Sequence, residues 1–365
     1  MTWTTEIIEG INQVEPDEWN RLIKNRPFAT WHWLQITEVV LANHQPRYVL
    51  LRHNGNLQAA AVCSIQNRFQ SRMLQSTLGW LPYRFPILRC GVPISYDMGL
   101  FFSDQQPVEQ LLSQLLDGLQ ILLRTERVSF HSFDYLSPED PVWFSLKAQG
   151  YHRVDHLTET NLDIQWTSFE EYLSRLAKKR RKEYVRIRGR LEREGITIEV
   201  ADLLMENKTV LQRLVNNVFQ HHGEPTLYRD NLFSKAHALM GEDFKLVVAH
   251  QNGERIGCIA LLRSGNEWSV KWPGLNYELT LDTGTYYGLL AECVHQTIQA
   301  GGTRLRMGAT AYQTKQHFGI AVDERIGAMA VRSRPFHWLA GKILNVTANP
   351  EITQATPKTF DSGGV

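Results

Sequence analysis

The sequence predicts an α/β fold in which a domain with a mixed sheet occurs twice. Two segments, residues 48–65 and 246–263, are alike at an offset of 198 residues, and each has a β-rich run, an Asn-Gly pair and a second β-rich run. An Asn-Gly pair between two such runs is a strong signal for a tight β-hairpin. After each hairpin the same order of helix, strand, short helix and strand follows. Duplication of one α/β domain is the simplest explanation.

The first copy starts with the hairpin around Asn54-Gly55. Residues 108–126 then carry leucines at helical spacing, and residues 127–133 form a β-rich run. Residues 143–164 predict a short helix, a Gly-aromatic turn and one strand. These elements complete the first copy.

The second copy starts with the hairpin around Asn252-Gly253. The elements expected after it are a strand (267–274), a helix (286–302), a strand (303–308), a short helix within "GATAYQTKQHFGI" (308–320) and a closing strand (323–333). The order of hairpin, helix, strand, helix and strand therefore occurs twice.

A basic segment joins the two copies. Residues 174–195 hold ten Lys/Arg and three Glu, a local charge of +7, while apolar residues from Phe169 to Leu191 recur at three- and four-residue steps. This pattern predicts one linker helix with an apolar stripe, an N-cap at Ser168 and a stop at Gly195. Arg180 lies inside the stripe, so its guanidinium needs a carboxylate, a phosphate or backbone carbonyls, or must extend to solvent. The remaining cations are expected to form a solvated face.

These patterns divide the chain into an N-terminal domain (1–165), a basic linker helix (166–195), a C-terminal domain (196–348) and a tail (349–365). The tail is rich in Thr, Pro, Ser and Gly and is expected to be disordered.

Composition excludes several classes of protein. The 365 residues are 43% hydrophobic with a net charge of +1, as in an ordinary globular protein without a global field for nucleic acid. No signal-peptide pattern opens the sequence, and no apolar run is long enough to cross a bilayer. The four cysteines are scattered without zinc spacing, so we expect buried free thiols and a cytoplasmic protein with no metal site.

The order of several motifs resembles the tandem GNAT acyltransferases of the FemAB-like and BioF2-like branch. The stretches that carry the resemblance are "RPFATWHWLQI" (26–36), "LAKKRRKEYVRIRGRLEREG" (176–195), "FQHHGEPTLYRDNLF" (219–233) and "GTYYGLLAECVHQTIQAGGTRLRMGATAYQTKQHFG" (284–319). Together they span most of residues 17–335. The resemblance implies duplicated GNAT-like domains that transfer an acyl group, from acyl-CoA as co-substrate or from aminoacyl-tRNA. The Arg/Gln-x-x-Gly-x-Gly/Ala phosphate motif of standard GNATs is absent before "LDTGTYYGLL".

The segment 282–292 is the candidate donor site. Thr283 or Thr285 would cap a helix whose first amides favour anions, and Gly284 would let a phosphate approach the backbone next to Tyr286. A plain capped helix packed on the sheet is the alternative. The matching helix of the first copy lacks a Gly-rich turn, so we expect the N-terminal domain to be degenerate and to help form the acceptor cleft.

The turn "HHGEPTLYRD" (221–230) is a candidate for proton transfer. An amine must lose a proton to attack an acyl donor, and Glu224 or His222 is the candidate base. Tyr228 in the same turn and Arg180 in the linker are candidate substrate-binding residues. The alternative is a loop whose polar side chains cap neighbouring elements. The adjacent histidines lack the spacing of a zinc site.

The segment 308–320 supplies the remaining candidates. Tyr312 would orient the acceptor or protonate the leaving group, and Lys315 would hold a phosphate or carboxylate. The resemblance places a lysine equivalent to Lys315 near the active site. No nucleophile motif is present, so direct attack by the amine is preferred to an acyl-enzyme.

These observations predict an N-acyltransferase that moves an acyl group from acyl-CoA to a small-molecule or cell-envelope amine in the cleft between the domains. One alternative is a FemAB-type transferase that uses aminoacyl-tRNA to modify a cell-wall precursor, with the basic linker meeting the tRNA. Another is a non-catalytic, envelope-associated protein. In that case residues 332–344, an aromatic and basic stretch, would make a peripheral membrane contact, although a packed helix is the simpler expectation.

Overall fold

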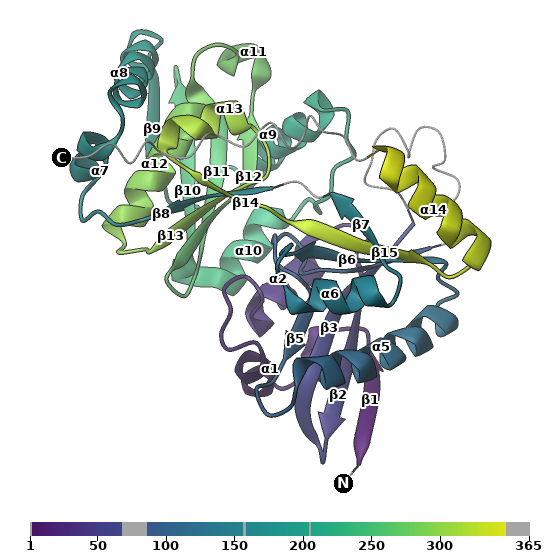
Figure 1. Ribbon diagram of the computed structural model, residues 1–365. Coiled ribbons are helices and arrows are strands. Elements are labelled where there is room, and N and C mark those ends of the chain that lie inside the picture. The colour runs from purple at the N-terminus through teal and green to yellow at the C-terminus, as the bar shows by residue number, and fades with distance from the viewer. Residues whose placement is uncertain (1, 68–85, 156–157, 204–205, 348–365) are drawn as a thin grey trace, which may run out of the picture.

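Two mixed sheets form the framework of the protein (Figure 1). The computed structural model describes residues 2–67, 86–155, 158–203 and 206–347. The predicted disordered tail lies outside the described residues.

The first sheet has the order β1-β2-β3-β4-β6-β15-β7, with β5 pairing to β3. Its strands are β1 (Trp3–Ile8), β2 (Gln45–His53), β3 (Asn56–Gln66), β4 (Ile87–Cys90), β5 (Leu100–Phe102), β6 (Phe130–Leu136), β7 (His152–Asp155) and β15 (Ile326–Val331). The pair β4–β6 is parallel, and the other pairs are antiparallel.

The second sheet, given in the matching direction, has the order β9-β10-β11-β12-β13-β8-β14. Strand for strand, this order repeats that of the first sheet. Its strands are β8 (Glu159–Asp163), β9 (Ile196–Ala201), β10 (Phe244–Gln251), β11 (Glu254–Ser264), β12 (Glu267–Leu275), β13 (Arg304–Gly308) and β14 (Ala321–Asp323). Here β12–β13 is the parallel pair. The prediction of a duplicated α/β fold is confirmed.

The two hairpins have the turns that their sequences predict. Asn54 and Gly55 have φ angles of 49° and 84°, and Asn252 and Gly253 have 52° and 80°. Both central residues of each turn are thus in the left-handed region, which suits Asn and Gly. The register also shifts at equivalent places, between Leu51 and Arg52 in β2 and between Ala249 and His250 in β10. The repeat therefore extends to the irregularities of the strands.

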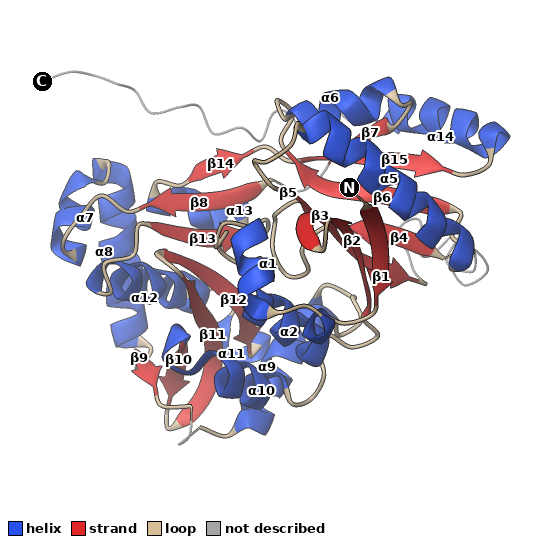
Figure 2. Cartoon of the chain, turned by 90° about the horizontal axis from the view of Figure 1, so that it is seen from below, coloured by secondary structure: helices blue, strands red, loops and turns tan. Residues whose placement is uncertain are grey.

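Helices cover both sheets, and three apolar cores result. The helices are α1 (Pro16–Leu22), α2 (Trp31–Val40), α5 (Val108–Thr125), α6 (Pro141–Ala148), α7 (Phe169–Arg175), α8 (Lys178–Arg193), α9 (Lys208–His221), α10 (Leu232–Met240), α11 (Tyr277–Thr280), α12 (Thr285–Gln299), α13 (Tyr312–Lys315) and α14 (Arg334–Thr347), with short 3-10 turns η1 (Ile11–Gln13), η2 (Gly241–Asp243) and η3 (Gln316–Phe318). Helices α5 and α6 lie beside the first sheet, and α7, α8 and α12 lie beside the second (Figure 2). The third core contains α1, α2, α9 and α10 with the inner faces of both sheets, so the halves share one interior.

The two sheets exchange one strand each, which the sequence analysis did not anticipate. Strand β8 lies within the expected N-terminal domain but pairs with β13 and β14 of the second sheet. Strand β15 was expected to close the second copy but pairs with β6 and β7 of the first. The segment 143–164 accordingly forms two strands, β7 and β8, in different sheets rather than one. The sheets therefore do not follow the expected boundary at residue 165, because each sheet contains one strand from the other side of it.

The basic segment forms two helices, α7 and α8, so the prediction of one linker helix is wrong. Leu176 has a ψ angle of 144°, and Ala177 begins the second helix from an extended conformation. The predicted ends hold: the Ser168 side chain accepts a hydrogen bond from the Glu171 N–H, and Gly195 has a φ of 65°. The apolar stripe is thus divided over two helices that pack on the same core.

All four cysteines are free and buried, as predicted. Among the described residues, no helix has the length and apolar character needed to span a bilayer.

Candidate active site

The parallel strands β12 and β13 separate after a short paired stretch. Their pairing begins at Glu267–Arg304 and ends at Ser269–Arg306, although β12 continues to Leu275. A segment of the N-terminal half, residues 94–97, contacts both strands at this opening. Ala309 N–H donates to Tyr96 Oη at 3.3 Å, and Lys271 Nζ donates to the Ile94 carbonyl at 2.6 Å. The opening is therefore built from both halves of the chain.

An arginine on β13 organises this opening. Arg306 donates through Nε and Nη2 to both oxygens of Glu159, at 2.8 and 2.9 Å, and through Nη1 to Asp97 at 2.8 Å. Although burial disfavours its charged form, these two carboxylates raise the pKa of Arg306. Burial alone would raise the pKa of Asp97, but Arg306 and a hydrogen bond from Ser95 lower it. Arg306 and Asp97 therefore stay charged inside the protein, where a buried charge needs a partner of opposite sign.

Two buried lysines flank the arginine. Lys315 is only 1% exposed, and its pKa is lowered to about 7, chiefly by burial; Glu159 opposes this change and Lys271 adds to it. Lys271 is 7% exposed, and burial together with Arg306 lowers its pKa to about 8. We call Arg306, Lys271, Lys315, Glu159 and Asp97 the buried charge cluster. A lysine with a pKa near 7 exchanges protons readily at neutral pH.

The local chain geometry explains how Lys315 reaches this position. Gly308 ends β13 with a φ of 79°, and Ala311 has a φ of 53° just before α13. A methyl group on Gly308 would lie 3.8 Å from Lys315 Nζ, so the amine sits against the backbone at the end of the strand. The predicted short helix is present, and its last residue carries the amine inward.

Tyr312 stands at the other end of the same helix. Its hydroxyl donates to the Thr158 carbonyl at 2.7 Å and is half-buried. Burial raises its pKa, while the contacts with Thr158 oppose the rise. Tyr312 therefore ties α13 to the start of β8, the strand that carries Glu159.

The predicted donor residues lie at the start of α12. Gly284 has a φ of 85°, and a methyl group there would meet Ile187 Cγ2 at 2.7 Å. Packing against α8 is thus sufficient reason for a glycine. Thr285 is fully buried and its hydroxyl lies 2.6 Å from that of Thr283, whose oxygen accepts the Thr285 N–H. Tyr286 is half-buried, and burial raises its pKa.

The turn after α9 is divided between solvent and interior. His222 and Glu224 are exposed, and His222 is the C-cap residue that follows α9. Tyr228 is half-buried, 6.0 Å from the Trp272 ring, and it bridges to Leu41 of the N-terminal half. Burial raises the pKa of Tyr228, with a further contribution from Tyr96. Of the predicted residues in this turn, Tyr228 is the one that contacts both β12, through Trp272, and the N-terminal half, through Leu41.

Arg180 is half-buried at the start of α8. Burial raises the pKa of Tyr172, and Arg180 partly offsets that rise, so the two side chains are near one another. The Tyr172 hydroxyl donates to the Phe318 carbonyl at 3.0 Å, which connects α7 to the turn after α13. Farther along α8, Arg190 donates to the Asp282 carbonyl in front of α12.

The sequence analysis missed four members of the cluster: Asp97, Glu159, Lys271 and Arg306. A usable signal was present in two of them, because Lys271 in "SVKWPG" and Arg306 in "TRLRMG" are cations next to large apolar residues in expected strands. Nothing local marked Asp97 or Glu159 as their partners.

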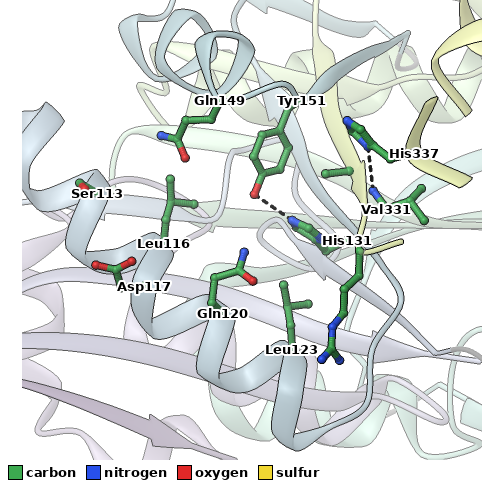
Figure 3. A pocket seen from close by; sticks show the side chains of 12 residues that line it. Ser113, Leu116, Asp117, Gln120, Leu123, His131, Gln149, Tyr151, Val331 and His337 are labelled. Atoms are coloured by element: carbon green, nitrogen blue, oxygen red, sulfur yellow. Dashed lines mark hydrogen bonds between the residues drawn. The ribbon is translucent and has the colours of Figure 1, made fainter. Parts of the chain in front are cut away.

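A surface hollow lies away from this cluster. A hollow of about 390 Å³ lies between α5, β6 and the start of α14, and it contains none of the predicted site residues (Figure 3). There His131 Nε2 lies 2.8 Å from the Tyr151 hydroxyl, and burial lowers the pKa of His131 to about 4. We place the candidate active site at the buried charge cluster because titratable groups with opposing environments meet there.

Several solved structures share this architecture. The chain is similar to FemX, with a TM-score of 0.59 at 12% identity over 92% of this chain and 100% of that one. It is also similar to a tandem GNAT protein from the clavulanic acid biosynthesis pathway, with a TM-score of 0.56 at 12% identity over 90% and 99%. A third is L-PGS from Bacillus licheniformis, with a TM-score of 0.52 at 11% identity over 94% and 99%. At these identities the similarity establishes the tandem GNAT fold alone.

No curated protein matches the chain at the level of sequence. A family model does match: the FemAB-like family, described as peptidoglycan biosynthesis/recognition, aligns with residues 10–304. Because this alignment spans most of the chain, the protein belongs to the FemAB-like family.

Proposed function

We propose that the protein transfers an acyl or aminoacyl group to an amine at the buried charge cluster. Family membership and the tandem GNAT fold support an acyl- or aminoacyltransferase. The observation that carries the proposal is Lys315, an almost fully buried amine with a pKa of about 7 beside the opening between β12 and β13.

Lys315 is the proposed general base. The carboxylates of Glu159 and Asp97 already accept three N–H groups of Arg306, so they are poorly placed to take a substrate proton. The predicted bases Glu224 and His222 are exposed on the turn after α9. A lysine with a pKa near 7 is neutral in a large fraction of molecules at neutral pH and can accept a proton.

The proton balance follows from this role. The neutral acceptor amine attacks the acyl carbonyl, a C–N bond forms, and the bond from that carbon to the leaving sulfur or oxygen breaks. The proton lost by the amine passes to Lys315 Nζ and then to the leaving thiolate or alkoxide. Nearby Glu159 favours the charged form of Lys315 while it holds this proton. Tyr312 is a proposed positioning residue because its hydroxyl fixes α13 to Thr158.

For the donor we propose acyl-CoA, with Gly284, Thr285 and Tyr286 near its phosphates. The start of a long helix favours anions, and the cations of α8 lie beside it, with Arg190 bonded to Asp282. We propose Arg180 and Tyr228 as contacts of the substrates. The second candidate is an aminoacyl-tRNA donor, which the exposed basic face of α8 favours.

Calorimetry with acetyl-CoA, longer acyl-CoAs and aminoacyl-tRNA distinguishes the donors. We expect acyl-CoA binding, whereas salt-sensitive binding of aminoacyl-tRNA alone would favour the second candidate. If none of them binds and no transfer occurs to simple amines or to a cell-wall stem peptide with a free amine, the proposed function is wrong.

The pH dependence of turnover tests the base. We expect kcat/KM to rise with pH and level off above about 7, where Lys315 is neutral. Lys315→Ala should lose this rise and reduce turnover by about 10²-fold or more, while Lys235→Ala, which alters an exposed lysine on α10, should leave it unchanged. An unaltered pH profile in Lys315→Ala would exclude Lys315 as the base.

A further inference from the structure

Helix α14 packs on the protein through one narrow face. It lies at the edge of the molecule, beside β15 and β7 (Figure 1). The His337 ring stacks on His152 with 4.3 Å between centroids, and a methyl group on Gly341 would meet the His152 ring at 2.5 Å. His337 also accepts the Val331 N–H through Nδ1, and its Nε2 lies 3.0 Å from the Gly150 carbonyl. These contacts fix which side of the helix faces outward.

The outward side carries large apolar residues. Phe336 is 63% exposed, Trp338 is 66% exposed and Leu339 is 45% exposed. Lys342 Nζ lies 5.5 Å from the centroid of the Trp338 ring, one turn farther along the helix. Three adjacent exposed apolar side chains, two of them aromatic, are unusual on a surface that meets only water.

The charges in the sequence of this helix and of the segment before it are all positive. No Asp or Glu occurs between residues 325 and 350, while Arg325, Arg332, Arg334 and Lys342 all fall in that interval. The last three are exposed. A face that combines aromatic residues with cations alone complements a surface that is apolar inside and negative outside.

We propose that α14 docks the protein on an anionic phospholipid bilayer, with Phe336, Trp338 and Leu339 in the interfacial layer and the flanking cations among the lipid phosphates. Tryptophan favours that layer because its ring is apolar and its N–H is polar. A second copy of the chain fits this face less well, since pairing α14 with itself would bring cations together. The attachment is peripheral, because no helix among the described residues is long and apolar enough to span a bilayer.

Vesicle flotation with the full chain tests the proposal. We expect the protein to float with vesicles of phosphatidylglycerol and phosphatidylcholine, and to float far less with phosphatidylcholine alone or at high salt. Phe336→Ser with Trp338→Ser should reduce binding by about tenfold or more for each ring removed. Arg334→Glu with Lys342→Glu should reduce it on anionic vesicles.

Leu281→Ser is the matched control, because Leu281 is also 66% exposed but follows α11 beside the other sheet. It should bind vesicles like the unaltered protein, and so should Lys315→Ala, so that a failure of the proposed chemistry is distinguishable from a failure of docking. Circular dichroism checks that each variant is folded. Equal binding to neutral and anionic vesicles, no binding to either, or a dimer that the double serine variant converts to a monomer would each overturn the proposal.

Discussion

Replacing Lys315 by methionine should stabilise the protein, and the gain should depend on pH in a defined way. Lys315 is almost fully buried, and its pKa falls from the usual 10.5 to about 7, mainly because burial disfavours the charge. A difference of that size corresponds to about 5 kcal/mol. Methionine fills a similar volume without the charge, so we expect a gain of about 2 to 5 kcal/mol in the free energy of unfolding at neutral pH.

The pH dependence has a sign that can be checked. Between pH 7 and 10.5 the unfolded chain holds a proton on Lys315 that the folded chain does not. The unaltered protein therefore gains stability as pH rises through this range. The variant lacks this contribution, so its advantage should be largest below about pH 7 and should disappear near pH 10.5.

Urea unfolding of both proteins at a series of pH values measures this difference. Lys235→Met, at an exposed lysine on α10, is the control and should change stability little at any pH. If the advantage of Lys315→Met does not depend on pH, or if the variant is less stable at neutral pH, the reasoning that burial lowers the pKa of Lys315 is refuted. The same variant should be inactive, which would separate the stability of the site from its chemistry.

Three further changes test other contacts. Glu159→Gln removes the charge that faces Arg306 through two hydrogen bonds, so urea unfolding should show a loss of about 3 kcal/mol. Gly284→Ala should cost about 1 to 3 kcal/mol because the methyl group meets Ile187 at a positive φ, and a double-mutant cycle with Ile187→Ala should recover the steric part of that loss. Tyr312→Phe removes one hydrogen bond to a carbonyl, so thermal unfolding should show a loss of about 1 kcal/mol, while turnover falls by more than the unfolded fraction explains.

Local signals in the sequence predicted the repeated elements well. The two Asn-Gly turns require left-handed backbone at both positions, and the structure has it at both hairpins. The leucines of residues 108–126 form the buried face of α5. Such features depend on neighbours within a few residues, which the sequence displays directly.

Non-local features were beyond the same reasoning. Nothing in "ETNLD" or "IGAMAV" indicates which sheet each strand joins, because strand pairing depends on partners far away in the chain. Glu159 and Arg306 form a buried ion pair although nearly half the chain separates them. Lys315 could be selected from its segment, but its burial and pKa depend on residues from both halves. The glycine at 284 was attributed to a phosphate, whereas contact with Ile187 already accounts for it.

The exchange of β8 and β15 constrains the order in which the chain can fold during synthesis. Phe130 of β6 pairs with Val331 of β15, roughly 200 residues later, so this contact closes a very long loop. Strand β7 leaves the ribosome early, yet within the described chain its pairing partner is β15. The first sheet therefore cannot be completed until residue 331 has emerged. Until then β6 can pair only with β4, and β7 lacks its partner in the sheet. Maturation of the two halves is coupled: neither sheet reaches its final form as an independent folding unit.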